Sequence, residues 1–182
     1  MACHRVNPKG LPIQQPSYRN KDPVAKDVAF VAELASMDFK HVLAPTDFGE
    51  PSGRAVKLAV ELAQSFNAML TLLHAYEVPV YTYPQVDSIV VDLITPIEQA
   101  AREQLDRELA TVQLKIPNAK SILRSGVPWR EILSVIDEVH ADLVVMGTHG
   151  RRGVTHALLG SVAEKVVRLS PVPVLTVRDR GS

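Results

Sequence analysis

The chain has 182 residues, 46% of them hydrophobic, and 20 basic against 20 acidic residues give a formal net charge of zero. This length can bury one good core, and the neutral charge argues against nucleic-acid binding driven by bulk charge. One cysteine, Cys3, excludes an internal disulfide framework. With no apolar run near the about 20 residues of a membrane span and no signal-like N-terminus, we expect a cytoplasmic protein without a membrane or nucleic-acid partner.

Residues 1–21 are rich in proline and polar residues, and we expect them to be disordered. Asp22-Pro23 then has the sequence of a helix start, and apolar residues recur at helical spacing up to about Ser36. This short helix packs on the domain, frays, or serves as a docking element for a partner protein. We assign residues 1–38 to an N-terminal extension.

Strand-like and helix-like segments alternate over the predicted domain, residues 39–179. The predicted strands are 41–45, 68–75, a strand beginning at 121–124, 143–146 and 173–177; the predicted helices are 51–66, 96–115 and 129–140, with a further helical pattern over 156–168. A long connection is expected from 77 to about 91. Alternation of this kind favours an α/β fold with a parallel sheet and helices on both faces. Such sheets bind ligands beyond the carboxyl ends of their strands, where strand order reverses.

The most informative segment is a glycine pattern after the fourth predicted strand. Gly147-Thr-His-Gly150 is followed by nine residues and then by Gly160-Ser161, close to a predicted helix start. Backbone N–H groups at a helix N-terminus are unpaired, and the helix dipole favours negative charge there. Glycine lets the backbone approach a ligand and adopts dihedral angles that a Cβ would forbid. The pattern therefore predicts a phosphate-binding loop.

The end of the first predicted strand is a second candidate. Ala44-Pro45-Thr46-Asp47 places a hydroxyl and a carboxylate just beyond the strand. Asp47 could orient a ribose, a base edge or a metal-bound water. Alternatively, Thr46 or Asp47 caps the following helix. The two roles are compatible, because the same exposed groups can serve both.

From these residues the chain resembles the universal stress protein family over about residues 39–179. The resemblance rests on four features in order: Pro45-Thr46-Asp47-Phe48, Leu72-Leu73-His74-Ala75, Gly126-Val127-Pro128, and the glycine–two–glycine–nine–glycine–serine spacing from Gly147 to Ser161. The family's ATP-binding members carry that spacing, and this chain keeps every position of it. The resemblance implies a five-stranded, Rossmann-like parallel sheet with strand order 3-2-1-4-5, and a dimer.

The resemblance also implies roles for particular residues. Backbone groups around Ala75 would meet the adenine edge, and Asp47 and Gly147 would lie beside the base and ribose. The adenosine walls would be Pro45, Thr46 and Met146, and the phosphates would be surrounded by Gly150, Gly160, Ser161 and Val162. We expect ATP as the ligand, with Mg²⁺ held mainly by phosphates and water.

Other polar residues near the glycines have two interpretations each. Arg151 and Arg152 either neutralise a triphosphate or are solvated loop charges. His149 and His156 either sense phosphate charge or are ordinary surface histidines. Elsewhere in the chain, His74 is expected to be a packed histidine, and Trp129 is expected to pack its helix onto the sheet or to border the pocket. Cys3-His4 lacks the ligand spacing of a zinc site.

Nothing in the sequence assigns a catalytic residue. The chain has no Gly-x-x-x-x-Gly-Lys-Ser/Thr loop and no Gly-x-Ser-x-Gly elbow. The leading hypothesis is an ATP-binding regulatory module in a stress response, read by unidentified protein partners. The alternatives are a slow ATPase or phosphotransferase, and an interaction protein that binds AMP or another adenine ligand. The apolar last strand, with Val172, Val174, Leu175 and Val177, predicts a homodimer through that edge.

Overall fold

The computed structural model describes residues 38–77, 87–148 and 159–178, and it leaves the side chains of 87–94 undescribed. The expected N-terminal helix lies outside the described residues. The core of the fold is a five-stranded parallel sheet in the order β3-β2-β1-β4-β5, which confirms the predicted topology. Its strands are β1 (His41–Pro45), β2 (Met69–Tyr76), β3 (Lys120–Ser125), β4 (Leu143–Gly147) and β5 (Val174–Val177).

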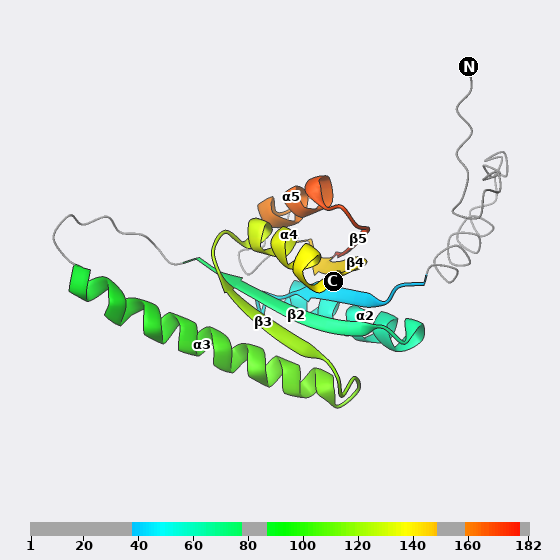
Figure 1. Cartoon of the computed structure of the whole chain (residues 1–182), viewed down its shortest axis with the longest axis horizontal. Helices are drawn as coiled ribbons and strands as arrows, with labels where there is room; N and C mark the ends of the chain where they lie inside the picture. The colour runs from blue at the N-terminus through cyan, green and yellow to red at the C-terminus, as the bar shows by residue number, and fades with distance from the viewer. Residues whose placement is uncertain (1–37, 78–86, 149–158, 179–182) are drawn as a thin grey trace, which may run out of the picture. The chain divides into compact units, whose positions relative to one another are not determined.

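Helices cover both faces of this sheet (Figure 1). They are α2 (Glu50–Phe66), α3 (Asp87–Gln113), α4 (Pro128–Val139) and α5 (Ser161–Leu169). Successive side chains of a strand point to opposite faces, and β1 obeys this rule. Val42 and Ala44 pack with residues of α2 and α3, whereas Leu43 packs with residues of α4 and α5. The protein thus has two hydrophobic layers, one on each side of β1.

The helix ends follow local sequence signals. Pro51 and Pro128 each lie in the first turn of their helix, where the missing N–H costs no hydrogen bond. Asn67 and His140 end the same two helices in the left-handed conformation, and each backbone N–H returns to carbonyls of the last turn. These caps determine where α2 and α4 end, and therefore where the chain enters β2 and β4.

The start of α3 was wrong in the sequence prediction. We expected the helix to begin at Pro96, but it begins at Asp87 and contains Pro96 in its interior. Proline is most common in the first helical turn. In a helix interior, proline removes one backbone hydrogen bond and its ring clashes with the preceding turn, so local sequence favours a helix start at Pro96. The predicted connection from 77 to about 91 is correspondingly shorter.

The chain path places the candidate site. From β1 the chain moves outward to β2 and β3, and then returns to β4 on the other side of β1. β1 and β4 are therefore hydrogen-bonded neighbours, with Val42 opposite Leu143 and Leu43 opposite Val144. Strand order reverses between them, so their carboxyl ends form the switch point at which parallel sheets bind ligands.

Candidate functional site at the ends of strands β1 and β4

Gly147 ends β4 in close contact with the start of α2. A Cβ on this residue would lie 3.0 Å from the carbonyl carbon of Pro51 and 3.1 Å from the backbone nitrogen of Ser52. Both are backbone atoms and cannot rotate away. A glycine is therefore favoured by the close packing of β4 against α2, whatever the site binds.

Thr148 joins the two ends of the glycine loop. Its N–H donates to the carbonyl of Val177 in β5 at 3.0 Å, and its own carbonyl accepts from the N–H of Gly160 at 2.8 Å. Residues on both sides of the intervening loop are thereby brought together. Gly147 and Gly160 are the glycines of the predicted pattern that the structure describes. Four other predicted site residues, His149, Gly150, Arg151 and Arg152, lie outside the described residues, as does His156.

Gly160 is the N-cap of α5, and the helix begins at Ser161. This start is later than the helical pattern from 156 suggested, and residues 159 and 160 are not helical. The cap makes no side-chain hydrogen bond, and the Ser161 residue is exposed. Val162 is partly buried against the layer beneath α5. First-turn N–H groups and an exposed hydroxyl make this end of α5 suitable for an anion.

We expected Gly147 and Gly160 to adopt backbone dihedral angles that a Cβ would forbid, and this expectation is wrong. Gly160 has φ −59° and ψ 152°, which any residue adopts. Among the described glycines only Gly126 has a positive φ, and that residue precedes α4. The close contact with α2 explains a glycine at position 147. At position 160 the backbone conformation does not explain why the residue is a glycine.

Asp47 lies in the connection between β1 and α2 and organises it. Its Oδ1 accepts hydrogen bonds from the N–H of Gly49 at 3.0 Å and from the Ser52 hydroxyl at 2.6 Å. The Thr46 hydroxyl accepts from the N–H of Phe48 at 3.1 Å. Gly49 occupies the N-cap position of α2, so neither side chain is the cap itself. Instead, both side chains hold the turn that leads into the helix.

The same turn contains a backbone conformation that is rare for a bulky residue. Phe48 has φ 62°, and its ring lies 4.3 Å from the ring of His74, measured between centroids. His74 Nδ1 lies 2.7 Å from the carbonyl oxygen of Thr46, so this nitrogen carries the proton and donates. His74 is thus a packed histidine, as the sequence predicted, and it joins the ends of β1 and β2.

The remaining predicted pocket walls come to the same edge of the sheet with different exposure. Pro45 is the buried last residue of β1, and Ala75 is partly exposed near the end of β2. Met146 is buried in the layer beneath α4 and α5. Trp129 packs in that layer too, with Lys165 of α5 5.1 Å from its ring centroid. The elements that carry these residues converge, but the Met146 side chain belongs to the core.

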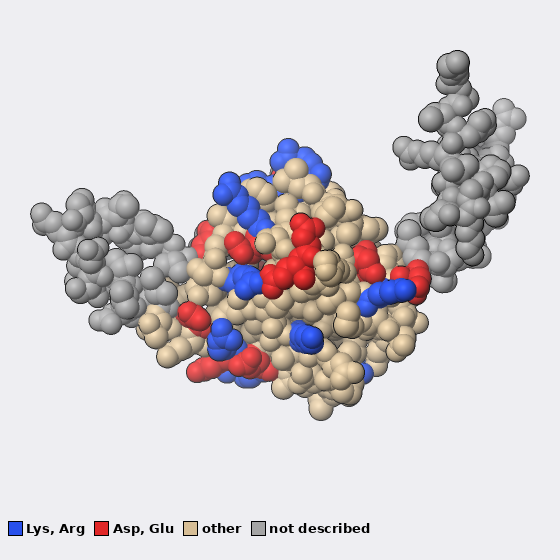
Figure 2. All heavy atoms as spheres, viewed as in Figure 1, with Lys and Arg blue, Asp and Glu red and all other residues tan. Residues whose placement is uncertain are grey.

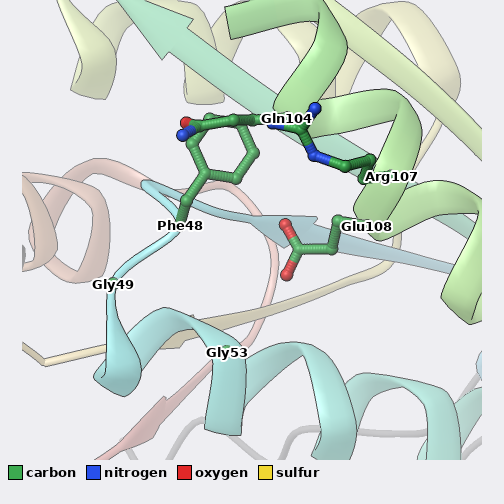
Figure 3. Close-up of a pocket in the computed structure, with 6 residues that line it drawn as sticks. All are labelled: Phe48, Gly49, Gly53, Gln104, Arg107 and Glu108. Carbon is green, nitrogen blue, oxygen red and sulfur yellow. The ribbon is translucent and has the colours of Figure 1, made fainter.

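A residue of α3 that sequence reasoning missed faces the Asp47 turn. Glu108 borders a cavity of about 300 Å³ between α2 and α3, together with Phe48, Gly49, Gly53, Gln104 and Arg107. Figure 3 shows the Glu108 carboxyl directed from α3 toward the start of α2. Burial raises the pKa of Glu108, the Thr46 hydroxyl opposes this rise, and the Asp47 carboxylate adds to it.

The missed residues had little local signal. Ser52 is a polar residue on the buried side of α2. Its position five residues after Asp47 was the only sequence feature that could have suggested their hydrogen bond. Thr148 acts through its backbone. Glu108 is one of many charged residues on α3.

The distribution of charged side chains does not indicate a second binding site on the face shown in Figure 2. Acidic and basic side chains are interspersed over the described part of that face, without a large region of one sign (Figure 2). Among the residues that the structure describes, no three His, Cys, Asp or Glu side chains are grouped to hold a metal ion. In the same part of the chain, no helix is long and apolar enough to cross a membrane.

The fold and the converging turns define a Rossmann-like α/β domain with a candidate site at its switch point. The chain belongs to the universal stress protein family, whose model matches residues 38–178. Universal stress protein A homolog 1 of Coxiella burnetii is 34% identical over 143 residues, covering 78% of this chain and 97% of the relative.

Solved structures agree with this assignment. Universal stress protein UspA from Lactobacillus plantarum superposes with a TM-score of 0.70 at 25% identity, covering 77% of this chain and 98% of the other. A universal stress protein in complex with cAMP superposes with a TM-score of 0.59 at 27% identity, covering 77% of this chain and 97% of the other.

Proposed function

We propose that this protein is an ATP-binding regulatory module of the stress response, with the nucleotide at the carboxyl ends of β1 and β4. The observation that carries the proposal is the hydrogen bond from Gly160 to the Thr148 carbonyl. It places the N-terminus of α5 beside the end of β4, one strand away from Asp47. A relative solved with cAMP supports an adenine nucleotide as the ligand.

Gly160 provides the second support. Its backbone conformation is open to every residue, and a glycine at this position allows a ligand to approach the backbone closely. The phosphates would lie against Gly160, Ser161 and Val162, where the helix dipole and first-turn N–H groups favour negative charge. Gly150, Arg151, Arg152 and His149 would complete this part of the site from the intervening loop.

The nucleoside would lie toward β1 and β2. Backbone groups at Ala75 would meet the adenine edge, and the Asp47 carboxylate would meet the ribose. Pro45 and Thr46 would line this part of the site. Met146 would support it from below, because its side chain is buried in the core. Mg²⁺ would be held by the phosphates and water, its usual mode with nucleotides.

The module would act through its loop and its surface. Occupancy of the site would favour one arrangement of the 148–160 segment, and partner proteins would distinguish that arrangement from the empty one. We further propose that residues 39–179 are the functional domain, that it works as a homodimer in the cytoplasm, and that the preceding extension is separate from it.

The test is calorimetric titration of the full chain with ATP-magnesium, ADP and AMP, combined with an assay of released phosphate. We expect micromolar ATP binding in the wild type and its loss in Gly160→Val, with no sustained turnover. Circular dichroism should show that this variant stays folded, since valine adopts the backbone angles of Gly160. Multiple-turnover phosphate release that the substitution abolishes would instead identify an ATPase. A preference for AMP would favour an adenine-responsive interaction protein, and a folded wild type that binds no nucleotide would refute the proposal.

A further inference from the structure

The carboxyl group of Glu108 is held in an unusual environment on the α3 side of the candidate site. Its Oε2 atom is buried and accepts no hydrogen bond from the part of the chain that the structure describes. The side chain enters the cavity of about 300 Å³ between α2 and α3, opposite Gly49 and Gly53 (Figure 3). A buried carboxylate oxygen that accepts no hydrogen bond is costly, so this environment disfavours the ionised form of Glu108 relative to water.

The groups around Glu108 belong to the turn that carries Asp47. The Thr46 hydroxyl interacts with the Glu108 carboxyl, and the negative charge of Asp47 acts on it. Burial is the largest cause of the raised pKa, followed by the opposing hydrogen bond from Thr46 and then by Asp47. Ionised Glu108 would therefore repel the carboxylate that holds the entrance to α2.

The other charged groups of the surrounding elements are already engaged. On α3, Arg107 borders the same cavity and pairs with Glu103 at 3.8 Å, and both side chains are well exposed. On α2, Arg54 pairs with Glu50 at 3.1 Å. On β2, His74 directs its Nδ1 to the Thr46 carbonyl. The charge that raises the pKa of Glu108 is that of the Asp47 carboxylate, in addition to the larger effect of burial.

We propose that Glu108 is a positioning residue of the nucleotide site and that its neutral form is the one that permits tight binding. This inference rests on the proposed function. Asp47 uses Oδ1 to hold Gly49 and Ser52, so a displaced Asp47 carboxylate would disturb the turn and the expected ribose contact together. An ionised Glu108 also adds negative charge near an anionic ligand. Affinity for the nucleotide should therefore decrease as pH rises through the titration of Glu108.

The experiment compares nucleotide affinity of the wild type, Glu108→Gln and Asp106→Asn from about pH 4 to about pH 8, a range that starts below the ordinary glutamate pKa of 4.5. Glutamine mimics the neutral acid in shape. Asp106 is an exposed acidic residue of the same helix that does not border the cavity, and Asp106→Asn gives the control. The ratio of wild-type to Glu108→Gln dissociation constants cancels ionisation of the ATP phosphates, which both proteins share.

We expect this ratio to be near one at the acidic end and to rise with pH. If the bound nucleotide raises the Glu108 pKa by one unit, the rise is about tenfold, because proton and nucleotide binding are reciprocally linked. Titration in buffers of different ionisation enthalpy should show proton uptake on binding to the wild type beyond that of Glu108→Gln. Asp106→Asn should follow the wild type in both measurements.

A ratio that stays constant with pH, together with equal proton uptake, would overturn the inference while leaving the proposed function intact. Loss of binding in Glu108→Gln at every pH would also overturn it, because the neutral isostere should bind. Absence of ATP binding by the wild type at every pH would refute the proposed function itself, and the two failures are thereby distinguishable.

Discussion

Gly147 at the end of β4 lies so close to Pro51 in the first turn of α2 that an added Cβ would be 3.0 Å from the Pro51 carbonyl carbon. Gly147→Ala should therefore force β4 and α2 apart. Overpacking of this kind costs about 1–3 kcal/mol. We expect the free energy of unfolding in urea to fall by that amount. Nucleotide affinity should fall too, because both predicted binding turns would move.

Gly53 is the matched control for this substitution. It lies inside α2, and a Cβ there would meet no atom within 4 Å. Gly53→Ala should leave stability unchanged or raise it by about 0.5–1 kcal/mol, because alanine loses less backbone entropy in a helix. Equal stability of the two alanine variants would show that the Gly147–Pro51 contact relaxes without cost.

His41 should make stability depend on pH. Its side chain is buried, and burial is the main reason that its pKa lies below the ordinary value of 6.5. Val139 and Asp142 oppose this lowering, whereas Lys120 and His140 add to it. The unfolded chain therefore binds the proton more readily. This contribution to stability is complete above about pH 6.5 and is lost as pH falls toward the folded-state pKa, by at most about 1.4 kcal/mol per pH unit.

His41→Gln isolates this effect in urea unfolding measured between about pH 5 and about pH 8. The variant is expected to be less stable at neutral pH, because the 2.8 Å hydrogen bond between Nε2 and Thr71 is altered. The difference from the wild type should narrow on acidification. The raised pKa of Glu108 acts in the opposite direction, with stability lost as pH rises, but it cancels because both proteins carry Glu108. A constant difference would contradict the prediction.

Asp142 should be important for the start of the sheet. Its Oδ2 accepts from the N–H of Lys40 at 2.7 Å, and its Oδ1 accepts from the N–H of His41 at 3.0 Å. Asp142→Ala would leave both backbone donors without this acceptor. We expect a loss of about 1.5–3 kcal/mol in thermal or urea unfolding, typical for hydrogen bonds to a charged group. The exposed Asp106→Ala on α3 is the control, and a similar loss there would mean that Asp142 has no special role.

Sequence periodicity was sufficient for most of the architecture. Alternating apolar segments gave every described strand to within a few residues, and the glycine spacing marked the end of β4 and the start of α5. The predicted start of α3 was wrong because proline favours the first helical turn over the interior, and the fold overrides that preference at Pro96.

The candidate site was less predictable than the fold. The reason for Gly147 is a contact with Pro51, a residue far away in the sequence, so no local pattern reveals it. The meeting of Glu108 with Asp47 depends on how α3 is rotated and how deeply it packs. Helical spacing identifies Leu105 and Leu109 as the apolar side of α3, but it does not say which polar neighbour reaches the end of β1.

The exposed edge of the sheet gives the last prediction, which concerns the oligomeric state. β5 is an edge strand, and Leu175 is 37% exposed, while Val167 and Leu169 of the preceding α5 are each 47% exposed. An apolar edge of this kind favours pairing with a second copy, and the family resemblance predicts a two-fold antiparallel pair. Light scattering at micromolar concentration should give a dimer.

Leu175→Arg should shift this equilibrium to the monomer, because pairing would place two buried charges near the two-fold axis. Leu114→Arg is the control. Leu114 is 86% exposed just beyond the end of α3, so arginine there should leave the dimer intact. A wild type that is monomeric would rule out this interface. A dimer that resists Leu175→Arg would place the contact elsewhere on the molecule, because an isologous interface cannot avoid a charge on its central strand.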